Sequence, residues 1–349
     1  MISVIIPIYN TAKWLPQCLD SVLGQDYRDI EVILVNDAST DESLDVCKRY
    51  AGKDNRIIII NKLQNEGPEL ARQLGYKNTN GEYVMYIDAD DWLDHSQMIS
   101  IMHRKAEETG ADYVEIGMQK VLDRHKWILK KCVASIPLLI EQPDLFDKYY
   151  LSFFGVNILS VNMWGKLYRK SVLDKANIKP VGVFMGEDLA YNIQLFPHLE
   201  RIYILNEIGY NYRMGGGTGR YNPHLLPDLK RLYLLKEELI DKYQYYKAHA
   251  WIRFELKNVL KTDICQRIAY GIDNDKEAAI SAILTELKAP IYAKLCEVDK
   301  SSAFWNDPFV KGLMNKDGAT MYEICRRQVV RDLPQRLLKR IGGGLLNLI

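Results

Sequence analysis

The sequence has few features of a secreted or membrane-spanning chain. Its six cysteines are scattered and form no Cys-x-x-Cys pair, which argues against a zinc site or a disulfide scaffold and fits a reducing compartment. No apolar run approaches the roughly 20 residues that span a bilayer. The N-terminus lacks the basic-then-apolar layout of a signal peptide. We therefore expect a cytoplasmic protein.

The chain also lacks an excess of charge. Lys and Arg number 46 against 45 Asp and Glu, a net charge of +1, so no overall field favours nucleic acid. The glycine-rich residues 215–219 lack the Lys-Ser/Thr sequence of a phosphate-binding P-loop. The histidines have no metal-pair spacing. What remains is 349 residues of ordinary composition, enough for one large or two ordinary domains.

The first 116 residues alternate strand and helix patterns five times. This predicts an α/β fold with a doubly wound, mostly parallel sheet and helices on both faces. After residue 117 the alternation stops, with an extended hairpin at 118–134, an aromatic helix at 144–154 and a hairpin or strand pair at 202–205 and 209–213. From Pro223 the apolar spacing is helical. We expect a catalytic domain at 1–222 and a helical region at 223–349.

A buried-strand pattern at Tyr83–Ile87 stops on three acids, Asp88, Asp90 and Asp91. Ligands collect at the carboxyl ends of strands in such sheets. Three adjacent carboxylates repel one another unless a cation or a polyol lies among them. Hard ions such as Mn²⁺ or Mg²⁺ take oxygen ligands, commonly one or two carboxylates plus substrate phosphates. The stretch therefore predicts a site for a metal-bound nucleotide.

A second acidic pair, Glu187-Asp188, follows Gly186 at the start of a predicted helix. Such a pair can serve the helix N-terminus and its dipole, or it can do proton transfer. The two roles are compatible.

Several motifs occur in an order that resembles the N-terminal half of family 2 inverting glycosyltransferases with the GT-A fold. They are Ile2–Asn10, Val35–Asp41, Asn65-Glu66-Gly67 with Ala71-Arg72, Tyr86–Trp92, Gly186-Glu187-Asp188 and Tyr210–Arg213. Each motif alone is weak, and the ordered set is specific. The likeness reaches about residue 215, and the helical remainder matches no family that we can name.

The resemblance implies roles on the donor side. It places Pro7, Ile8 and Tyr9 in the nucleobase pocket, Asp37 as acceptor of a hydrogen bond from the base, and Arg72 near the uridine or diphosphate. Asp88-Ala89-Asp90 corresponds to the acid-x-acid motif that contacts ribose and metal; Asp90 is favoured as metal ligand, with Asp91 close behind. Alternatively, Asp37 caps the helix that follows the second strand, and Arg72 is an ordinary exposed arginine on a helix.

The resemblance also implies a mechanism on the acceptor side. Asp188 is the expected base that takes the acceptor hydroxyl's proton, and Glu187 orients it or touches the acceptor. Trp164 and Lys166 either border the acceptor or form a core tryptophan with a lysine that reaches solvent. Tyr212, Arg213 and the glycine-rich segment are candidates for a flap over the diphosphate.

The expected function is transfer of a sugar from a nucleotide-sugar, most simply a UDP-sugar, to a surface polysaccharide or lipid-linked oligosaccharide. A sugar-phosphate nucleotidyltransferase is disfavoured, because residues 9–14 lack its glycine-rich, lysine-bearing loop. A non-catalytic binding module is disfavoured by the intact acids. The tail at 326–340 carries six Lys/Arg and one acid, a local net of 6 − 1 = +5. It is either a contact with the inner face of the cell membrane, which makes the protein peripheral, or a solvated helix.

Overall fold

The computed structural model describes residues 1–122, 127–142, 144, 149, 159–214, 223–297 and 306–332. Contacts within the chain define two compact units, the first made of Met1–Phe153 with Asn157–Gly216 and the second of Phe154–Val156 with Gly217–Ile349. The domain boundary expected at residue 222 lies outside the described residues and stays a prediction, as does the membrane role of the tail beyond residue 332. The helix expected at 144–154 also lies almost entirely outside them.

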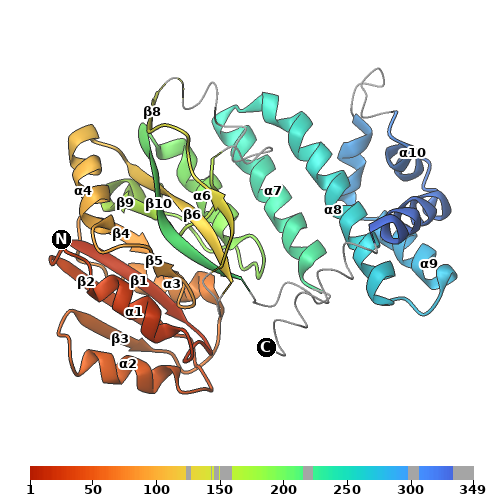
Figure 1. The fold of residues 1–349 in the computed structure, drawn as a ribbon. Coiled ribbons are helices and arrows are strands. Elements are labelled where there is room, and N and C mark those ends of the chain that lie inside the picture. Colours follow the sequence, from red (N-terminus) through yellow and green to blue (C-terminus); the bar gives the residue numbers. More distant parts are fainter. Residues whose placement is uncertain are drawn as a thin grey trace. The chain divides into compact units, whose positions relative to one another are not determined.

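The first unit is built on one sheet (Figure 1). Its main path runs β3-β2-β1-β4-β9-β6-β10-β5, with β7 paired to β6 and β8 to β10. The strands are β1 (Ile2–Ile8), β2 (Ile30–Asn36), β3 (Ile57–Asn61), β4 (Tyr83–Tyr86), β5 (Trp92–Leu93), β6 (Tyr113–Leu122), β7 (Trp127–Cys132), β8 (Leu138–Glu141), β9 (Lys166–Arg169) and β10 (Arg201–Met214).

Parallel pairing brings the functional strand ends together. β3, β2, β1 and β4 are parallel to their neighbours, and so are β6 and β10, while β9 runs antiparallel between β4 and β6. In this register Ile8 lies opposite Asn36 at the ends of β1 and β2. Ile87, just past β4, donates its N–H to the carbonyl of Ile5 at 3.1 Å. The segments that follow these three strands therefore lie at one sheet edge.

Helices cover both faces of the sheet. The first unit contains α1 (Leu15–Leu23), α2 (Ser43–Ala51), α3 (Pro68–Tyr76), α4 (Met98–Thr109), α5 (Lys170–Ala176), α6 (Glu187–Leu195) and the 3₁₀ turn η3 (Phe196–His198). Alternate residues of β1 and β2, such as Val4 and Val32, pack in one core cluster with α1, α2 and α4. Their neighbours Ile33 and Val35 pack with Ala71 of α3 on the opposite face.

The close packing of α3 explains a glycine inside a helix. A Cβ on Gly75 would lie 2.5 Å from Cγ2 of Ile5 and 3.2 Å from Cγ2 of Val35. The missing side chain lets α3 approach the sheet, and α3 carries Arg72 toward the sheet edge.

The sequence correctly predicts the α/β class, but one local prediction is wrong. The strand pair expected at 202–205 and 209–213 is one strand, β10, with register shifts between Ile204 and Ile208 and between Ile208 and Tyr210. Gly209 makes no turn there; its lack of a Cβ leaves room for Met98, whose Sδ would lie 2.6 Å from such an atom. The hairpin expected after residue 117 is confirmed as β6 and β7.

The second unit is helical in its described part, as predicted. Its elements are α7 (Leu225–Tyr243), η4 (Tyr246–Ala248), α8 (His249–Tyr270), α9 (Lys276–Glu286), η5 (Pro290–Glu297), α10 (Pro308–Met314) and helical residues 318–332. No helix in the described ranges is both long and apolar enough to cross a membrane.

Candidate active site

The turns after β1 and β2 are tied to each other at the sheet edge. Asn10 adopts a left-handed backbone with φ of 51°, and its Oδ1 accepts the N–H of Thr40 at 2.8 Å. Tyr9, next to it, is 48% exposed, so its ring is available to a ligand. Ile8 differs from the expectation of a pocket side chain, because it is 1% exposed and belongs to the core. Its carbonyl accepts the N–H of Asp37 at 2.8 Å, and a place for Ile8 in a nucleobase pocket stays a prediction.

Asp37 follows β2 and is buried with internal partners. Its Oδ2 accepts the N–H of Gly67 at 2.8 Å, its Oδ1 accepts the N–H of Glu66 at 3.1 Å, and Lys62 donates to the same Oδ1. In this structure the carboxylate holds the 65–67 turn and does not cap the helix after β2. No local pattern in the sequence indicates Lys62, because its ion pair with Asp37 joins residues 25 positions apart.

The acids after β4 have different environments. The side chains of Asp88 and Asp90 are partly exposed, whereas Asp91 is 1% exposed. Burial, then the charge of Asp88, raises the pKa of Asp90. Asp91 Oδ1 accepts the backbone N–H of Arg213 at 2.7 Å, so this carboxylate anchors the loop to β10. Ala89 packs in the core beneath them.

Arg213 fastens the same loop from the other side. Its Nε donates to the carbonyl of Asp90 at 2.6 Å, and its Nη2 donates to Oε1 of Gln17 at 2.7 Å. Its guanidinium lies over the Trp92 ring, 4.7 Å from the ring centroid. Arg213 therefore shapes the acidic loop, a role that the sequence did not reveal because Arg213 is 123 positions away from Asp90.

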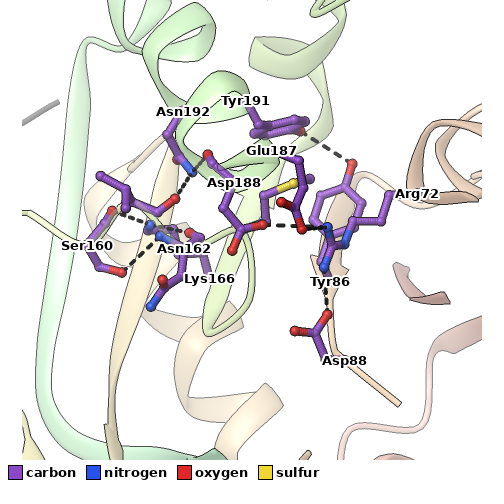
Figure 2. A network of polar contacts seen from close by, with 12 residues as sticks. Arg72, Tyr86, Asp88, Ser160, Asn162, Lys166, Glu187, Asp188, Tyr191 and Asn192 are labelled. Atoms are coloured by element: carbon purple, nitrogen blue, oxygen red, sulfur yellow. Dashed lines mark hydrogen bonds and ion pairs between the residues drawn. The ribbon is translucent and has the colours of Figure 1, made fainter. Parts of the chain in front are cut away.

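Arg72 joins the two acidic clusters (Figure 2). Its Nη2 donates to Oδ1 of Asp88 at 2.7 Å. Its Nη1 lies 3.4 Å from Oε1 of Glu187 and 3.6 Å from Oδ1 of Asp188. The side chain is 5% exposed, so the alternative of an ordinary surface arginine is wrong. One guanidinium thus forms ion pairs with three carboxylates, one that follows β4 and two in the first turn of α6.

The acids of α6 face this guanidinium. Gly186, with φ of 83°, precedes the helix and has no side chain that could cap it. The carboxylates of Glu187 and Asp188 point to Arg72, as Figure 2 shows. Burial raises the pKa of Asp188 to about 7; the charge of Arg72 lowers it, and the charges of Asp88 and Glu187 raise it. Asp188 can therefore gain or lose a proton near neutral pH.

A cavity of about 240 Å³ borders this bridge. Arg72 and Glu187 form part of its wall, together with the rings of Tyr76, Tyr86 and Tyr191. Tyrosine rings beside charged groups suit a polar ring such as a saccharide.

Lys166 lies in the interior rather than at an open edge. It is 0% exposed, and its Nζ donates to the carbonyls of Ser160 at 2.7 Å and Asn162 at 2.6 Å (Figure 2). Its Nζ is 3.7 Å from Oε2 of Glu115, and burial lowers its pKa. Neither the expected acceptor contact nor a lysine reaching solvent fits this position. The sequence missed Glu115 as its partner.

Trp164 fits the core alternative better than an open platform. It is 8% exposed and stacks on Tyr210, with ring centroids 4.5 Å apart. Tyr212 stacks on it at 5.6 Å. A direct contact with an acceptor stays a prediction.

The donor set after β4 fits a hard divalent cation. Asp88 and Asp90 offer carboxylate oxygens, and their mutual repulsion would be relieved by positive charge. The described residues contain no cluster of three His, Cys, Asp or Glu side chains placed to hold a metal ion. A cation here would therefore need oxygens from a bound phosphate as well, which agrees with the usual binding of Mg²⁺.

Comparisons with known proteins identify the class. Residues 3–175 match the family "Glycosyl transferase family 2". The crystal structure of S. aureus TarS 1–349 in complex with UDP-GlcNAc has a TM-score of 0.62 at 19% identity, covering 96% of this chain and 91% of that one. The fold is thus that of a GT-A glycosyltransferase. Through this domain the chain belongs to glycosyltransferase family 2.

Two curated relatives match over similar lengths. Glycosyltransferase GlyA of Streptococcus pneumoniae serotype 4 is 30% identical over 220 residues, covering 62% of this chain and 31% of the relative. The uncharacterized glycosyltransferase EpsJ of Bacillus subtilis is 31% identical over 215 residues, covering 61% of each. The matched part of the chain thus spans 31% of the length of GlyA and 61% of that of EpsJ.

Proposed function

We propose that the chain is a metal-dependent, inverting glycosyltransferase that moves a sugar from a UDP-sugar to an acceptor hydroxyl of a surface polysaccharide or lipid-linked oligosaccharide. The observation that carries this proposal is the Arg72 bridge, which holds an acid from the end of β4 beside the Glu187-Asp188 pair of α6. A donor-side group and a candidate base are thereby fixed around one small space.

The donor side is supported by the sheet edge. Tyr9 is exposed beside the turns after β1 and β2, and Asp88 and Asp90 follow β4 at the same edge. TarS, whose fold is similar, has been solved with UDP and with UDP-GlcNAc. When bound, the cation supplies positive charge against the departing diphosphate. Asp90 is the ligand favoured for it, because Asp91 is enclosed and binds Arg213.

The acceptor side depends on Asp188. A pKa of about 7 leaves a sizeable ionised fraction at neutral pH and gives the carboxylate more basicity than an ordinary aspartate. The carboxylate of Asp188 accepts the hydroxyl proton as the acceptor oxygen bonds to the sugar carbon and the diphosphate departs. One displacement of this kind inverts the anomeric centre and needs no covalent intermediate. Arg72, whose Nη1 lies 3.6 Å from Oδ1 of Asp188, would orient this carboxylate for the transfer.

The test replaces the base while keeping its shape. Asp188→Asn should lower transfer by roughly 10²- to 10⁴-fold, the usual contribution of a general base. Binding of UDP with Mn²⁺, followed by calorimetry, should stay near the wild-type value. The donor is first found by a thermal-shift screen of UDP-, GDP- and TDP-sugars with and without Mn²⁺.

Asp45→Asn is a matched control, because Asp45 also lies in the first turn of a helix and its side chain is 77% exposed. It should transfer sugar at the wild-type rate. Near wild-type transfer by Asp188→Asn would refute the base assignment. Pyrophosphate release from UTP and a sugar phosphate would refute the reaction class.

A further inference from the structure

Strand β7 exposes a run of large apolar side chains. Trp127 is 62% exposed, Ile128 48% and Leu129 55%, and Val133 just beyond the strand is 42% exposed. A strand that packs on a core buries every second residue. Here three consecutive apolar residues are largely exposed, so burial in the core does not explain their apolar character.

The position of β7 in the sheet keeps this run accessible. Among the described residues, β7 pairs with β6 alone, in an antiparallel register from Met118↔Cys132 to Leu122↔Trp127. The register shifts between Lys120 and Val121, which leaves Leu129 as an extra residue on the β7 side. Such bulges twist an edge strand and hinder the addition of another strand. The run is therefore poorly suited to sheet extension.

The sequence around the apolar run is rich in positive charge. Residues 120–133 contain five basic residues and one acid, a local net of 5 − 1 = +4, whereas the whole chain carries +1. Lys130 and Lys131 of β7 are exposed. A second copy of this surface would meet it with like charge, which disfavours self-association through β7. An anionic surface with an apolar interior complements it in both respects.

We propose that β7 is a contact site for an anionic lipid bilayer. Trp127, Ile128 and Leu129 enter the boundary between headgroups and acyl chains, where tryptophan is favoured. Lys130 and Lys131 stay at the headgroup level and bind lipid phosphates. This site lies on the first unit and differs from the basic tail at 326–340. It does not depend on the proposed transfer reaction.

The test is co-sedimentation of the full chain with vesicles. The protein should bind vesicles of phosphatidylcholine with phosphatidylglycerol, and should bind phosphatidylcholine alone much more weakly. Lys130→Gln with Lys131→Gln should weaken binding about 25-fold, taking about fivefold for each lysine near an anionic surface. Trp127→Ser, Ile128→Thr and Leu129→Ser together should weaken it by at least about tenfold. Added salt should weaken the electrostatic part.

The control variants change similar side chains elsewhere on the first unit. Leu63→Ser removes an apolar side chain that is 94% exposed, and Lys48→Gln with Lys53→Gln removes two exposed charges. Both should bind vesicles as the wild type does. Thermal melting should show the same transition for every variant, which separates lost contact from lost folding.

A second measurement reports on the depth of Trp127. Lipids brominated on their acyl chains should quench part of the tryptophan fluorescence, and Trp127→Phe should lose most of that quenching while still binding vesicles. Unchanged vesicle binding by both β7 variants would overturn the proposal and leave the tail as the contact. Absence of vesicle binding by the wild type would overturn it too, as would self-association that requires Trp127, Ile128 and Leu129.

Discussion

Replacing Arg72 by glutamine separates two roles for this arginine, which are to lower the pKa of Asp188 and to bind the diphosphate. In the structure its Nη1 lies 3.6 Å from Oδ1 of Asp188, and its side chain is 5% exposed. At that separation of 3.6 Å an effective dielectric constant of about 20 gives an attraction of roughly 4.6 kcal/mol, or about 3 pKa units. Shifts caused by one adjacent opposite charge are about 1–3 units. We therefore expect Arg72→Gln to raise the pKa of Asp188 by about 1–3 units above its value of about 7.

The sign of the effect on rate follows from the role of the base. Asp188 accepts a proton only when it is ionised, so kcat/KM falls as pH drops through its pKa. In the wild type the acidic limb of the plot of kcat/KM against pH should lie near pH 7, the pKa of this carboxyl group. In Arg72→Gln the limb should move to higher pH. The loss of rate should be large at neutral pH and partly recovered in alkaline buffer.

The assay is UDP release from the identified donor, measured across pH at low donor concentration. Arg72→Lys is the matched variant, because it keeps the charge and loses the two-ended geometry. Its limb should move less than that of Arg72→Gln. If Arg72→Gln lowers the rate equally at every pH, the reasoning is refuted. Arg72 would then act on the diphosphate, as the sequence resemblance implied, and not on Asp188.

Two further predictions concern stability. Because burial and neighbouring acids raise the pKa of Asp188 from its ordinary value of 3.8 to about 7, the folded state holds a proton there that the unfolded state has released, and stability falls as pH rises through that window. Asp188→Asn should therefore stabilise the fold by up to about 4 kcal/mol at about pH 8 and by almost nothing at about pH 4, measured by urea unfolding; equal effects at both pH values would contradict this. Lys166→Met should destabilise the fold by about 3–5 kcal/mol, because it leaves the Glu115 carboxyl enclosed without its cation. Adding Glu115→Gln should recover part of that loss, and strictly additive effects in the double-mutant cycle would show that the two groups do not interact.

The sequence predicted the sheet edge well because the relevant signals are local. β-branched runs such as Ile2–Ile8 and Ile30–Asn36 form buried strands, and short crossovers make them parallel. Parallel strands end at the same edge, so Tyr9, Asp37 and Asp88 could be placed together without coordinates.

The side-chain pairings could not be predicted, since each joins distant parts of the chain. Arg72 meets Glu187 across 115 positions, and only the packing of α3 and α6 on the sheet decides that contact. For Lys166 the local sequence pattern itself was misleading. A lysine beside a tryptophan suggests a surface, yet carbonyls of Ser160 and Asn162 supply enough acceptors to hold its ammonium group in the interior.

Local turn signals also yielded to tertiary packing in β10. Asn206, Glu207 and Gly209 favour a turn, but hydrogen bonding to β6 continues on both sides of them. The chain accommodates its extra residues as bulges rather than reversing direction. Arg213 lies near the end of the same strand, where it contacts Asp90 and Asp91.

Burial raises the pKa of Asp188, and the count of charges at the bridge explains why Arg72 does not cancel that rise. Asp88, Glu187 and Asp188 surround a single guanidinium, and Asp88 has the shortest contact, at 2.7 Å. The guanidinium can compensate one carboxylate fully and the others in part, so the partner with the longest contact gains least from its charge. Asp188 is that partner, at 3.6 Å. Its basicity thus depends on Arg72 being shared with Asp88, and any ligand that draws Asp88 away from Arg72 would leave more of the guanidinium's charge to Asp188 and ease its ionisation.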